Sequence, residues 1–471
     1  MGGLRHAVLA GPGVAGVEDV GVAGSVLDLV ADRVVIAAGL AAAGHVDRRR
    51  RALPGVVTVV AILALCLFRR ENADLVLARV PWVGAPGDGP PSAQALSGAR
   101  ARLVGEPVRE VFTATAAAGP VGGESLLFGL VVTAFDGTVF DLVNTAAIVG
   151  EFATPAGGRF PQARAVTLVC CGTRRMLAAV VDSCGVSEQA LADRLADTVG
   201  PGTLNLADRG FFSMARWVAF SAGGGHLAWR VKNGVRSLPA RIVRVLSDGS
   251  VLVRLRESDA MLTARRRRHA DRGLTRLPDT LARLVEFVLT VTDDTGRSRT
   301  SRFRILTTLL DPDRCPAQQV AAGYARRWQA ETAYFHLKVT LRGAGTRLRG
   351  QSPALARQEI WGLLVVYNAV VDLAVAAAID LGVDPGRISF TAVLALTVGG
   401  AAGQPACRHC GHPPGSGDPR TDLIAAISAQ PVNRIRRPRT GPRTTRQRAT
   451  EHTRKVTYTI TIVPPDLPKT E

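Results

Sequence analysis

The sequence has few lysines, few acidic residues for its size and no regular pattern of cysteines. Seven cysteines are an odd number, and most lie in apolar runs, so we expect reduced thiols rather than a disulfide framework. The first residues lack the basic, apolar and cleavage-site order of a signal peptide, and the longest apolar run, Val56 to Phe68, is too short to cross a bilayer. We therefore expect a cytoplasmic protein with no membrane role.

Acidic side chains are scarce relative to basic ones. The 471 residues include 58 Lys and Arg but only 39 Asp and Glu, which gives a net charge of +19. An excess of this size needs an acidic partner, and nucleic acid is the commonest one. Only four basic residues are lysines (Lys232, Lys338, Lys455 and Lys469), so a lysine in a candidate site is more informative than an arginine. With 47% apolar residues, the chain can form two or three domains with a large core.

Composition separates both ends of the chain from its middle. Residues 1–95 are predicted to be helical, and the Gly/Pro-rich stretch 84–92 marks their edge. Residues 96–125 predict a basic amphipathic helix and a turn, and this helix either lies on DNA or packs between domains. Residues 386–471 are rich in Pro, Arg, Thr and Gly and include the polybasic stretch 434–448. We expect a disordered tail that is attracted to phosphate without sequence preference.

Residues 126–385 have the pattern of an α/β domain. Buried strands are predicted at 126–136, 165–171, 176–183, 203–208 and 226–232, with helices at 187–199 and from Phe211. This order suits a mixed sheet covered by helices. An insertion at about 233–305 predicts two hairpins on either side of a basic loop at 263–272.

The segment from Tyr324 to Lys338 contains no Gly or Pro and is predicted to be helical. At roughly 100° per residue, Tyr324, Arg327, Glu331 and Lys338 fall on one stripe of the helix. One acid then lies beside two bases and a phenol. The stripe is either a solvated face with an i,i+4 ion pair or one wall of a site that handles phosphate. The choice depends on whether other carboxylates face Glu331.

Asp136 and Asp208 are the candidate partners for Glu331. Each is predicted to end a buried strand with a Gly within two residues, where ligands gather in open α/β sheets; the alternative is that each Asp only opens a turn. Three carboxylates across one sheet can hold two divalent cations about 3.5–4 Å apart for phosphoryl transfer. Mg²⁺ suits such a site because it binds through a few carboxylates and keeps its waters. We expect Mn²⁺ to substitute for it.

Four motifs in this order resemble those of DDE transposases of the insertion-sequence-four group. The spacing of the four stripe residues matches the group's signature. "FDGTVFDLVNT" and "LNLADRGFFS" are similar to its two aspartate motifs, and "HLAWRVK" resembles the strand after them, whose basic residue, Arg230 or Lys232, would contact DNA. The likeness covers about residues 20–380 and extends to the group's helical N-terminal domain.

The resemblance implies an α/β fold: a ribonuclease-H-like mixed sheet with a β-rich insertion, preceded by an all-α N-terminal DNA-binding domain. It implies that Asp136, Asp208 and Glu331 are the catalytic, metal-binding triad, and that Tyr324, Arg327 and Lys338 bind DNA. The implied activity is Mg²⁺-dependent nicking at the inverted repeats of an insertion sequence, followed by attack of the freed 3′-hydroxyl on target DNA. We expect a homodimer in the DNA complex and a nucleoid-associated location.

The resemblance is incomplete at one step of the reaction. Some relatives close a DNA hairpin at the element end, helped by an aromatic residue of the β insertion, often Trp. Residues 233–300 contain no Trp or Tyr, and Phe287 lies in an apolar strand. Trp328 is next to Arg327, but nothing in the sequence shows that it replaces the missing aromatic.

The sequence is compatible with two other functions and contains candidate ligands for one other metal. The chain is alternatively a non-catalytic DNA-binding remnant of a transposase, or a ribonuclease-H-like nuclease that cuts DNA without strand transfer. "CRHCGH" offers Cys407, Cys410 and His412, but a structural zinc needs a fourth ligand from His409 or another chain. We therefore expect no zinc site there.

Overall fold

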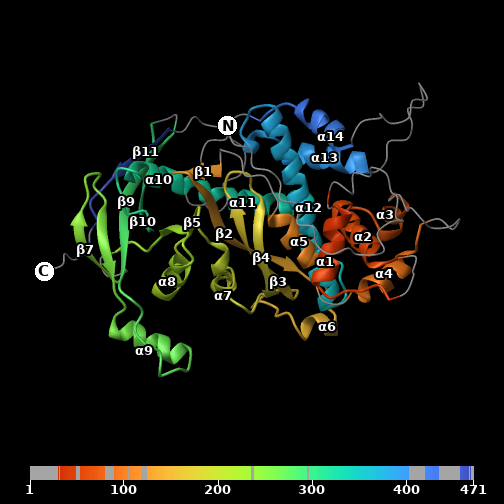
Figure 1. Cartoon of the computed structure of the whole chain (residues 1–471), viewed down its shortest axis with the longest axis horizontal. Helices are drawn as coiled ribbons and strands as arrows, with labels where there is room; N and C mark the ends of the chain where they lie inside the picture. The colour runs from red at the N-terminus through yellow and green to blue at the C-terminus, as the bar shows by residue number, and fades with distance from the viewer. Residues whose placement is uncertain are drawn as a thin grey trace.

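A mixed sheet of 11 strands runs through the centre of the protein, and helices pack on both of its faces (Figure 1). The arrangement is that of a computed structural model, which describes residues 30, 32–48, 53–79, 90–103, 106–117, 125–234, 238–293, 296–401, 419–433, 457–465 and 467. Two apolar cores flank the sheet. The larger joins one face to the N-terminal and C-terminal helices, and the smaller lies under the opposite face.

Five strands form the central part of the sheet in the order β4-β3-β2-β5-β6. They are β2 (Leu130–Asp141), β3 (Gln162–Cys170), β4 (Met176–Ser183), β5 (Thr203–Ala207) and β6 (His226–Arg230), and a short β1 (Leu126–Leu127) pairs with β2. Strands β2 to β4 are antiparallel, whereas β5 and β6 run parallel to β2. Parallel neighbours need crossover connections. This order confirms the predicted ribonuclease-H-like mixed sheet.

Short helices connect the central strands. They are α6 (Ala146–Val149), α7 (Glu188–Asp193), the 3₁₀ turn η2 (Ala196–Thr198) and α8 (Met214–Ala222). Helix α7 packs on β3 and β4, and α8 packs on β6. Leu191 of α7 and Trp217 and Phe220 of α8 are fully buried in the smaller core. The predicted helix at 187–199 is thus shorter than expected and ends in a 3₁₀ turn.

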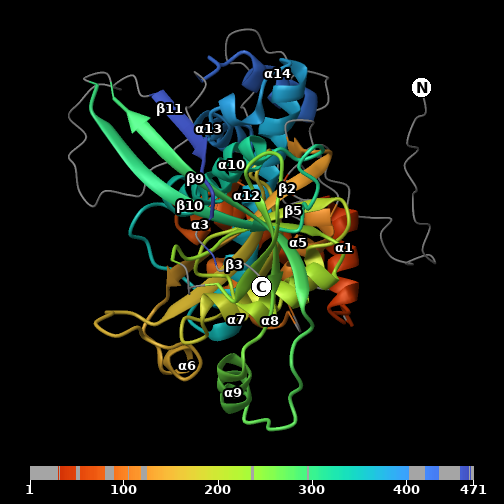
Figure 2. The ribbon, with the colours of Figure 1, turned by 90° about the vertical axis from the view of Figure 1, so that its left-hand side faces the viewer.

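The predicted β-rich insertion continues the same sheet. It comprises β7 (Ala240–Val245), β8 (Val251–Leu255), α9 (Asp259–Arg268), β9 (Thr280–Thr292) and β10 (Ser298–Thr307). Strand β10 pairs with β6, and the sheet proceeds through β9 and β8 to β7. The prediction of a basic loop at 263–272 is wrong for the first half of that stretch, which belongs to α9. Ser258 caps this helix by accepting from Met261 N (3.2 Å), and its arginines lie in the last turn, where the helix dipole favours cations. Helix α9 projects from the body of the protein (Figure 2).

The N-terminal helices share a core with the sheet. They are α1 (Arg33–Ala42), α2 (Gly55–Leu67), α3 (Ala73–Arg79), α4 (Ala93–Ala101) and α5 (Pro107–Ala117). The single amphipathic helix predicted within 96–125 is divided between α4 and α5, because Pro107 starts a new helix. Val111 and Phe112 of α5 are buried, and the Phe112 ring lies 5.5 Å from that of Trp361. Of the two alternatives for this region, α5 therefore supports packing within the protein.

Helix α12 (Pro353–Asp380) connects the N-terminal helices to the sheet, since it packs on α2, α4, α5 and β4. It is the one described helix that is long and apolar enough to cross a membrane. However, 83% of its most apolar window is buried inside the protein, as in the core helix of a globular protein. Before it comes a continuous helical segment of α10 (Ala317–Tyr324), η3 (Ala325–Arg327), α11 (Trp328–Phe335) and the π-helix η4 (His336–Leu341).

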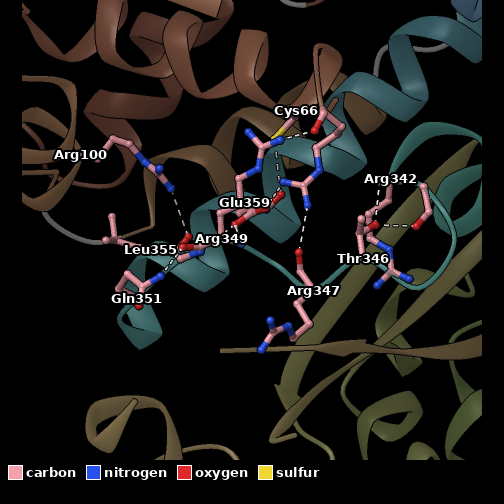
Figure 3. A network of polar contacts seen from close by, with 12 residues as sticks. Cys66, Arg100, Arg342, Thr346, Arg347, Arg349, Gln351, Leu355 and Glu359 are labelled. Carbon is pink, nitrogen blue, oxygen red and sulfur yellow. Dashed lines mark hydrogen bonds and ion pairs between the residues drawn. The ribbon is translucent and has the colours of Figure 1, made fainter. Parts of the chain in front are cut away.

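A buried ionic junction fixes the loop after this segment to the N-terminal helices (Figure 3). Glu359 of α12 pairs with Arg69, which follows α2, and both side chains are less than a tenth exposed. The second oxygen of Glu359 accepts from the backbone N–H of Arg349 (2.8 Å) and of Gly350 (3.0 Å). Arg349 in turn donates to the carbonyl of Arg69. The junction holds together segments that are almost 300 residues apart in the sequence.

The described residues of the C-terminal region are folded, which corrects for them the expectation of a disordered tail. It contains η5 (Pro385–Arg387), α13 (Phe390–Ala401), α14 (Pro419–Ser428) and β11 (Thr457–Ile462). Helix α14 buries Leu423 and Ile427 against α12 and α13, and β11 pairs with β9. A few apolar residues and a strand partner are enough to order segments of this composition. The polybasic stretch 434–448 lies outside the described residues.

Candidate active site

Asp136 lies in the middle of β2, although the sequence predicted it at the end of a strand. Ala134 precedes it on the same face of the sheet and is buried in the larger core, so strand alternation turns Asp136 toward the helices of that core. The Asp-Gly pair does not form the predicted turn. Gly137 pairs with Val166 of β3, and β2 continues to Asp141.

Two tyrosines fix the helical segment across the strands. The hydroxyl of Tyr334 donates to the carbonyl of Asp136 (2.7 Å) and is 2.8 Å from Thr167 Oγ1, which therefore acts as donor to it. The hydroxyl of Tyr324 donates to the carbonyl of Ala207 (3.1 Å) at the end of β5. Tyr324 is only 7% exposed, so it fixes the helix to β5 and is not an exposed residue that could contact DNA.

Asp208 directly follows β5, as the sequence predicted. Ala134 of β2 pairs with Leu206 of the parallel strand β5, and the same register sets Asp208 opposite Asp136. Asp208 Oδ1 is buried and accepts no hydrogen bond from any described residue, while Arg230 Nη1 at the end of β6 lies 3.7 Å away. Of the two basic residues proposed for β6, the structure places Arg230 at the acids. Lys232 is exposed beyond the strand.

Arg327 connects the helix to both aspartates. Its Nη2 donates to Glu331 Oε1 (3.2 Å), and its guanidinium lies 5.3 Å from the centre of the Trp328 ring. Burial lowers the pKa of Arg327, but the charges of Tyr324, Asp208, Glu331 and Asp136 outweigh burial and raise it. One buried cation thus interacts with all three acids that the sequence selected, and the alternative of a solvated stripe does not fit this part of the helix.

The acids are not fully neutralised by Arg327. Burial, helped by the carboxylates of Glu188 and Glu331, raises the pKa of Asp136 to about 7, although the Gly137 N–H and Arg327 oppose this shift. Burial also raises the pKa of Glu188, with Arg164 opposing this shift and Asp208 adding to it. Glu188, in the first turn of α7, escaped the sequence analysis because only the fold brings it to β2.

Lys338 lies apart from the acids. It follows Glu331 by two helical turns, within the π-helix η4, whose wider turn departs from the 100° spacing assumed for the stripe. Burial and the neighbouring Arg342 lower the pKa of Lys338, while Asp141 at the end of β2 opposes them. No described residue forms a hydrogen bond or ion pair with its ammonium group. Lys338 thus marks a second, basic part of the site farther along β2.

An aromatic cavity of ≈ 120 Å³ adjoins Arg230 and Arg327. Phe287 of β9 and Phe303 of β10 pair across the two strands, and their rings are stacked with centroids 5.2 Å apart. The Arg230 guanidinium lies 4.4 Å from the centre of the Phe303 ring. The pair was not predicted from the sequence, because Phe303 lies beyond the stretch 233–300 that contains no Trp or Tyr. The hairpin register of β9 and β10 was the signal that would have revealed Phe303.

Oxygen ligands predominate at the site, which suits a hard divalent cation. The acids Asp136, Asp208 and Glu331 and the unbonded Asp208 Oδ1 are the right donors. Even so, no three His, Cys, Asp or Glu side chains of the described residues stand together at the separation of metal ligands. Arg327 lies among the three acids instead. The candidate zinc ligands Cys407, Cys410 and His412 are outside the described residues.

Comparisons with known proteins match both parts of the chain. The family model described as insertion element 4 transposase N-terminal matches residues 23–113, and the model described as transposase DDE domain matches residues 127–369. Transposase InsG for insertion sequence element IS4 of Escherichia coli (strain K12) is 31% identical over 372 residues, which cover 76% of this chain and 79% of that protein. Among solved structures, the piggyBac transposase synaptic complex with hairpin DNA is 10% identical and matches with a TM-score of 0.41, over 86% of this chain and 85% of that one.

Proposed function

This chain belongs to the insertion element 4 family of DDE transposases, which are metal-dependent DNA enzymes, and from this premise we propose its reaction in detail. The protein cleaves DNA at the terminal inverted repeats of its insertion sequence and joins the freed 3′-hydroxyl ends to target DNA. The observation that carries this proposal is the arrangement of Asp136, Asp208 and Glu331 around the buried Arg327. Its net charge of +19 suits a DNA substrate.

Asp136, Asp208 and Glu331 would hold the metal, which we propose is Mg²⁺ with Mn²⁺ as a substitute. When bound, a divalent cation activates the attacking oxygen and stabilises the leaving oxygen of the phosphodiester. The protein supports its own acids through Tyr334 and Tyr324, which fix the helix to β2 and β5. The charge of Arg327 attracts the three acids and holds them near one another. Arg230, which lies beside Asp208, would donate hydrogen bonds to a phosphate of the DNA.

The basic part of the site would bind the DNA backbone away from the metal. Lys338 has no partner among the described residues, so its ammonium group is available to a phosphate oxygen. Lys232 is exposed just after β6 and would add positive charge near Arg230, at the end of that strand. We also propose that the protein acts as a homodimer on the DNA, in the cytoplasm at the nucleoid, and that residues 1–95, 96–125, 126–385 and 386–471 are its functional regions.

The stacked pair Phe287 and Phe303 supports a hairpin step at the element end. A base that leaves the DNA stack needs an aromatic face, and base stacking on such a ring contributes about 1–3 kcal/mol. The cavity is lined by Arg230, Arg327 and Trp328, and a base of the cleaved end would lie in it. Phe303 would take the place of the Trp of some relatives after Arg230 leaves the face of the ring that it covers in this structure.

The test is a plasmid that carries the element between its own ends, incubated with the purified protein and Mg²⁺. We expect release of the element and its insertion elsewhere, with short direct repeats at the new junctions. Cut ends that never join target DNA would support the alternative of a nuclease. Specific binding without any cleavage would support the alternative of a non-catalytic remnant.

Lys338→Arg tests whether this residue is a positioned phosphate ligand. Arginine keeps the charge but has a different shape and reach. We expect the variant to fold, to bind end DNA within about twofold of the wild type and to cleave about ten times more slowly or worse, because a donor is misplaced in the transition state. Gel-based cleavage rates measure the effect. Lys232→Arg is the matched control: only the charge of this exposed residue is expected to matter, so the variant should cleave at the wild-type rate. Full activity of Lys338→Arg would show that general positive charge is sufficient.

A further inference from the structure

Glu188 brings a fourth carboxylate to the acids. It lies in the first turn of α7, and its side chain extends to Gly137 of β2. A Cβ on Gly137 would lie 2.2 Å from Glu188 Oε1, so the carboxylate occupies the space that the absent side chain leaves. Gly137 is the residue directly after Asp136. The carboxylate of Glu188 therefore lies against the backbone that carries the first acid of the triad.

The usual role of an acid in the first turn of a helix does not account for this position. Such an acid interacts favourably with the helix dipole while it stays in water. Glu188 is instead partly buried and interacts unfavourably with both Asp136 and Asp208. Carboxylates that repel one another inside a protein raise its free energy unless a cation compensates them. Four acids interact here with three guanidinium groups, which are those of Arg164, Arg230 and Arg327.

We propose that Glu188 is a fourth carboxylate ligand of the divalent metal ions, approaching from the α7 side of β2. This inference rests on the proposed metal-dependent function. β5 ends at Ala207, so β2 has no partner from β5 at the level of Asp136 and Gly137. The Glu188 carboxylate of α7 reaches this stretch of β2 where Gly137 has no side chain. The proposal thus gives a reason for glycine after Asp136 in a strand where no turn requires one.

The experiment measures binding of Mn²⁺ alone to the full-length, DNA-free chain, with free Mn²⁺ followed by electron paramagnetic resonance. We expect Glu188→Gln to lower the Mn²⁺ affinity at least about tenfold. Gly137→Ala should lower it as well, because the new Cβ displaces the carboxylate while the extended backbone tolerates alanine. Asp197→Asn is the matched control: it removes one exposed carboxylate from η2, in the turn after α7, and should leave the affinity unchanged.

The outcomes separate this inference from the proposed function. If Asp136→Asn weakens Mn²⁺ binding and Glu188→Gln binds like the wild type, Glu188 is not a ligand and the inference is wrong. If neither substitution changes the affinity, the proposed metal centre itself is wrong. If Glu188→Gln fails to fold, the Mn²⁺ affinity of Glu188→Asp and of Gly137→Ala is measured instead. If both variants bind Mn²⁺ as tightly as the wild type, the proposal is wrong.

Discussion

Asp136→Asn, Asp208→Asn and Glu331→Gln are each expected to reduce cleavage of end DNA by about a thousandfold or more. A metal at a phosphoryl-transfer site contributes several kcal/mol of transition-state stabilisation, and each 1.4 kcal/mol is about tenfold in rate. Each substitution keeps the shape of the side chain but removes the charge that would hold the metal. Rates of strand cleavage in Mg²⁺ at saturating protein measure the loss.

Binding of end DNA should change little in the same three variants, because arginines and lysines rather than these acids would contact the phosphates. Asp182→Asn is the matched control, since Asp182 is also a strand carboxylate but pairs with Arg194 near the surface (2.7 Å). Asp136→Asn should also be at least as stable as the wild type without metal, because it removes a buried charge that Glu188 and Glu331 oppose. If one of the three variants cleaves DNA at the wild-type rate, the substituted residue is not a catalytic metal ligand.

Glu359→Ala is expected to lower the free energy of unfolding by about 3–5 kcal/mol, because it leaves Arg69 as a buried charge without its carboxylate. Two backbone N–H groups of the loop, on Arg349 and Gly350, lose their acceptor as well. Urea unfolding of the DNA-free protein measures the change. The double variant Arg69→Met with Glu359→Leu should recover part of the loss, since apolar replacement of both partners removes the uncompensated charge but leaves the two N–H groups without their acceptor.

The half-exposed pair of Asp182 and Arg194 gives the scale for this effect. Its side chains are 29% and 50% exposed, and breaking it should cost less than about 1 kcal/mol. Glu359→Ala with a cost no larger than that of Asp182→Asn would mean that the junction adds nothing beyond an ordinary surface pair. The N-terminal helices would then rely on apolar packing alone, chiefly that of α2 and α5 on α12.

The sequence predicts features that depend on local pattern and fails where distant segments meet. Asp208 at the end of β5 follows from the rule for parallel strands, and it was predicted correctly. The environment of Asp136 was not, because Asp-Gly is a strong turn signal and only Glu188 shows why a strand needs glycine there. Glu188 is close to Asp136 in space but not in the sequence, so no spacing reveals it.

Helical geometry set the second limit. The 100° rule placed Arg327 and Glu331 together, and their side chains indeed form an ion pair. The same rule failed to separate Lys338 from the acids, because the π-helix between them is set by tertiary packing rather than by a residue pattern. The partial order of the C-terminal region was missed for a related reason: the partner of β11 is β9, and strand pairing over such a separation leaves no local signal.

The position of β11 makes completion of the cavity depend on a segment that is synthesised long after β9. Ile460 lines the cavity beside Arg327, and Ile462 pairs with Phe287, a residue made about 175 positions earlier. At about 5–20 residues per second on the ribosome, roughly 9–35 s pass between the two. During that interval the edge of β9 from Phe287 to Thr292 lacks the neighbour it has in the finished chain and can bind other extended segments. A polypeptide that terminates before residue 457 would contain all three acids of the proposed triad but would lack β11, and with it the side of the cavity that Ile460 forms.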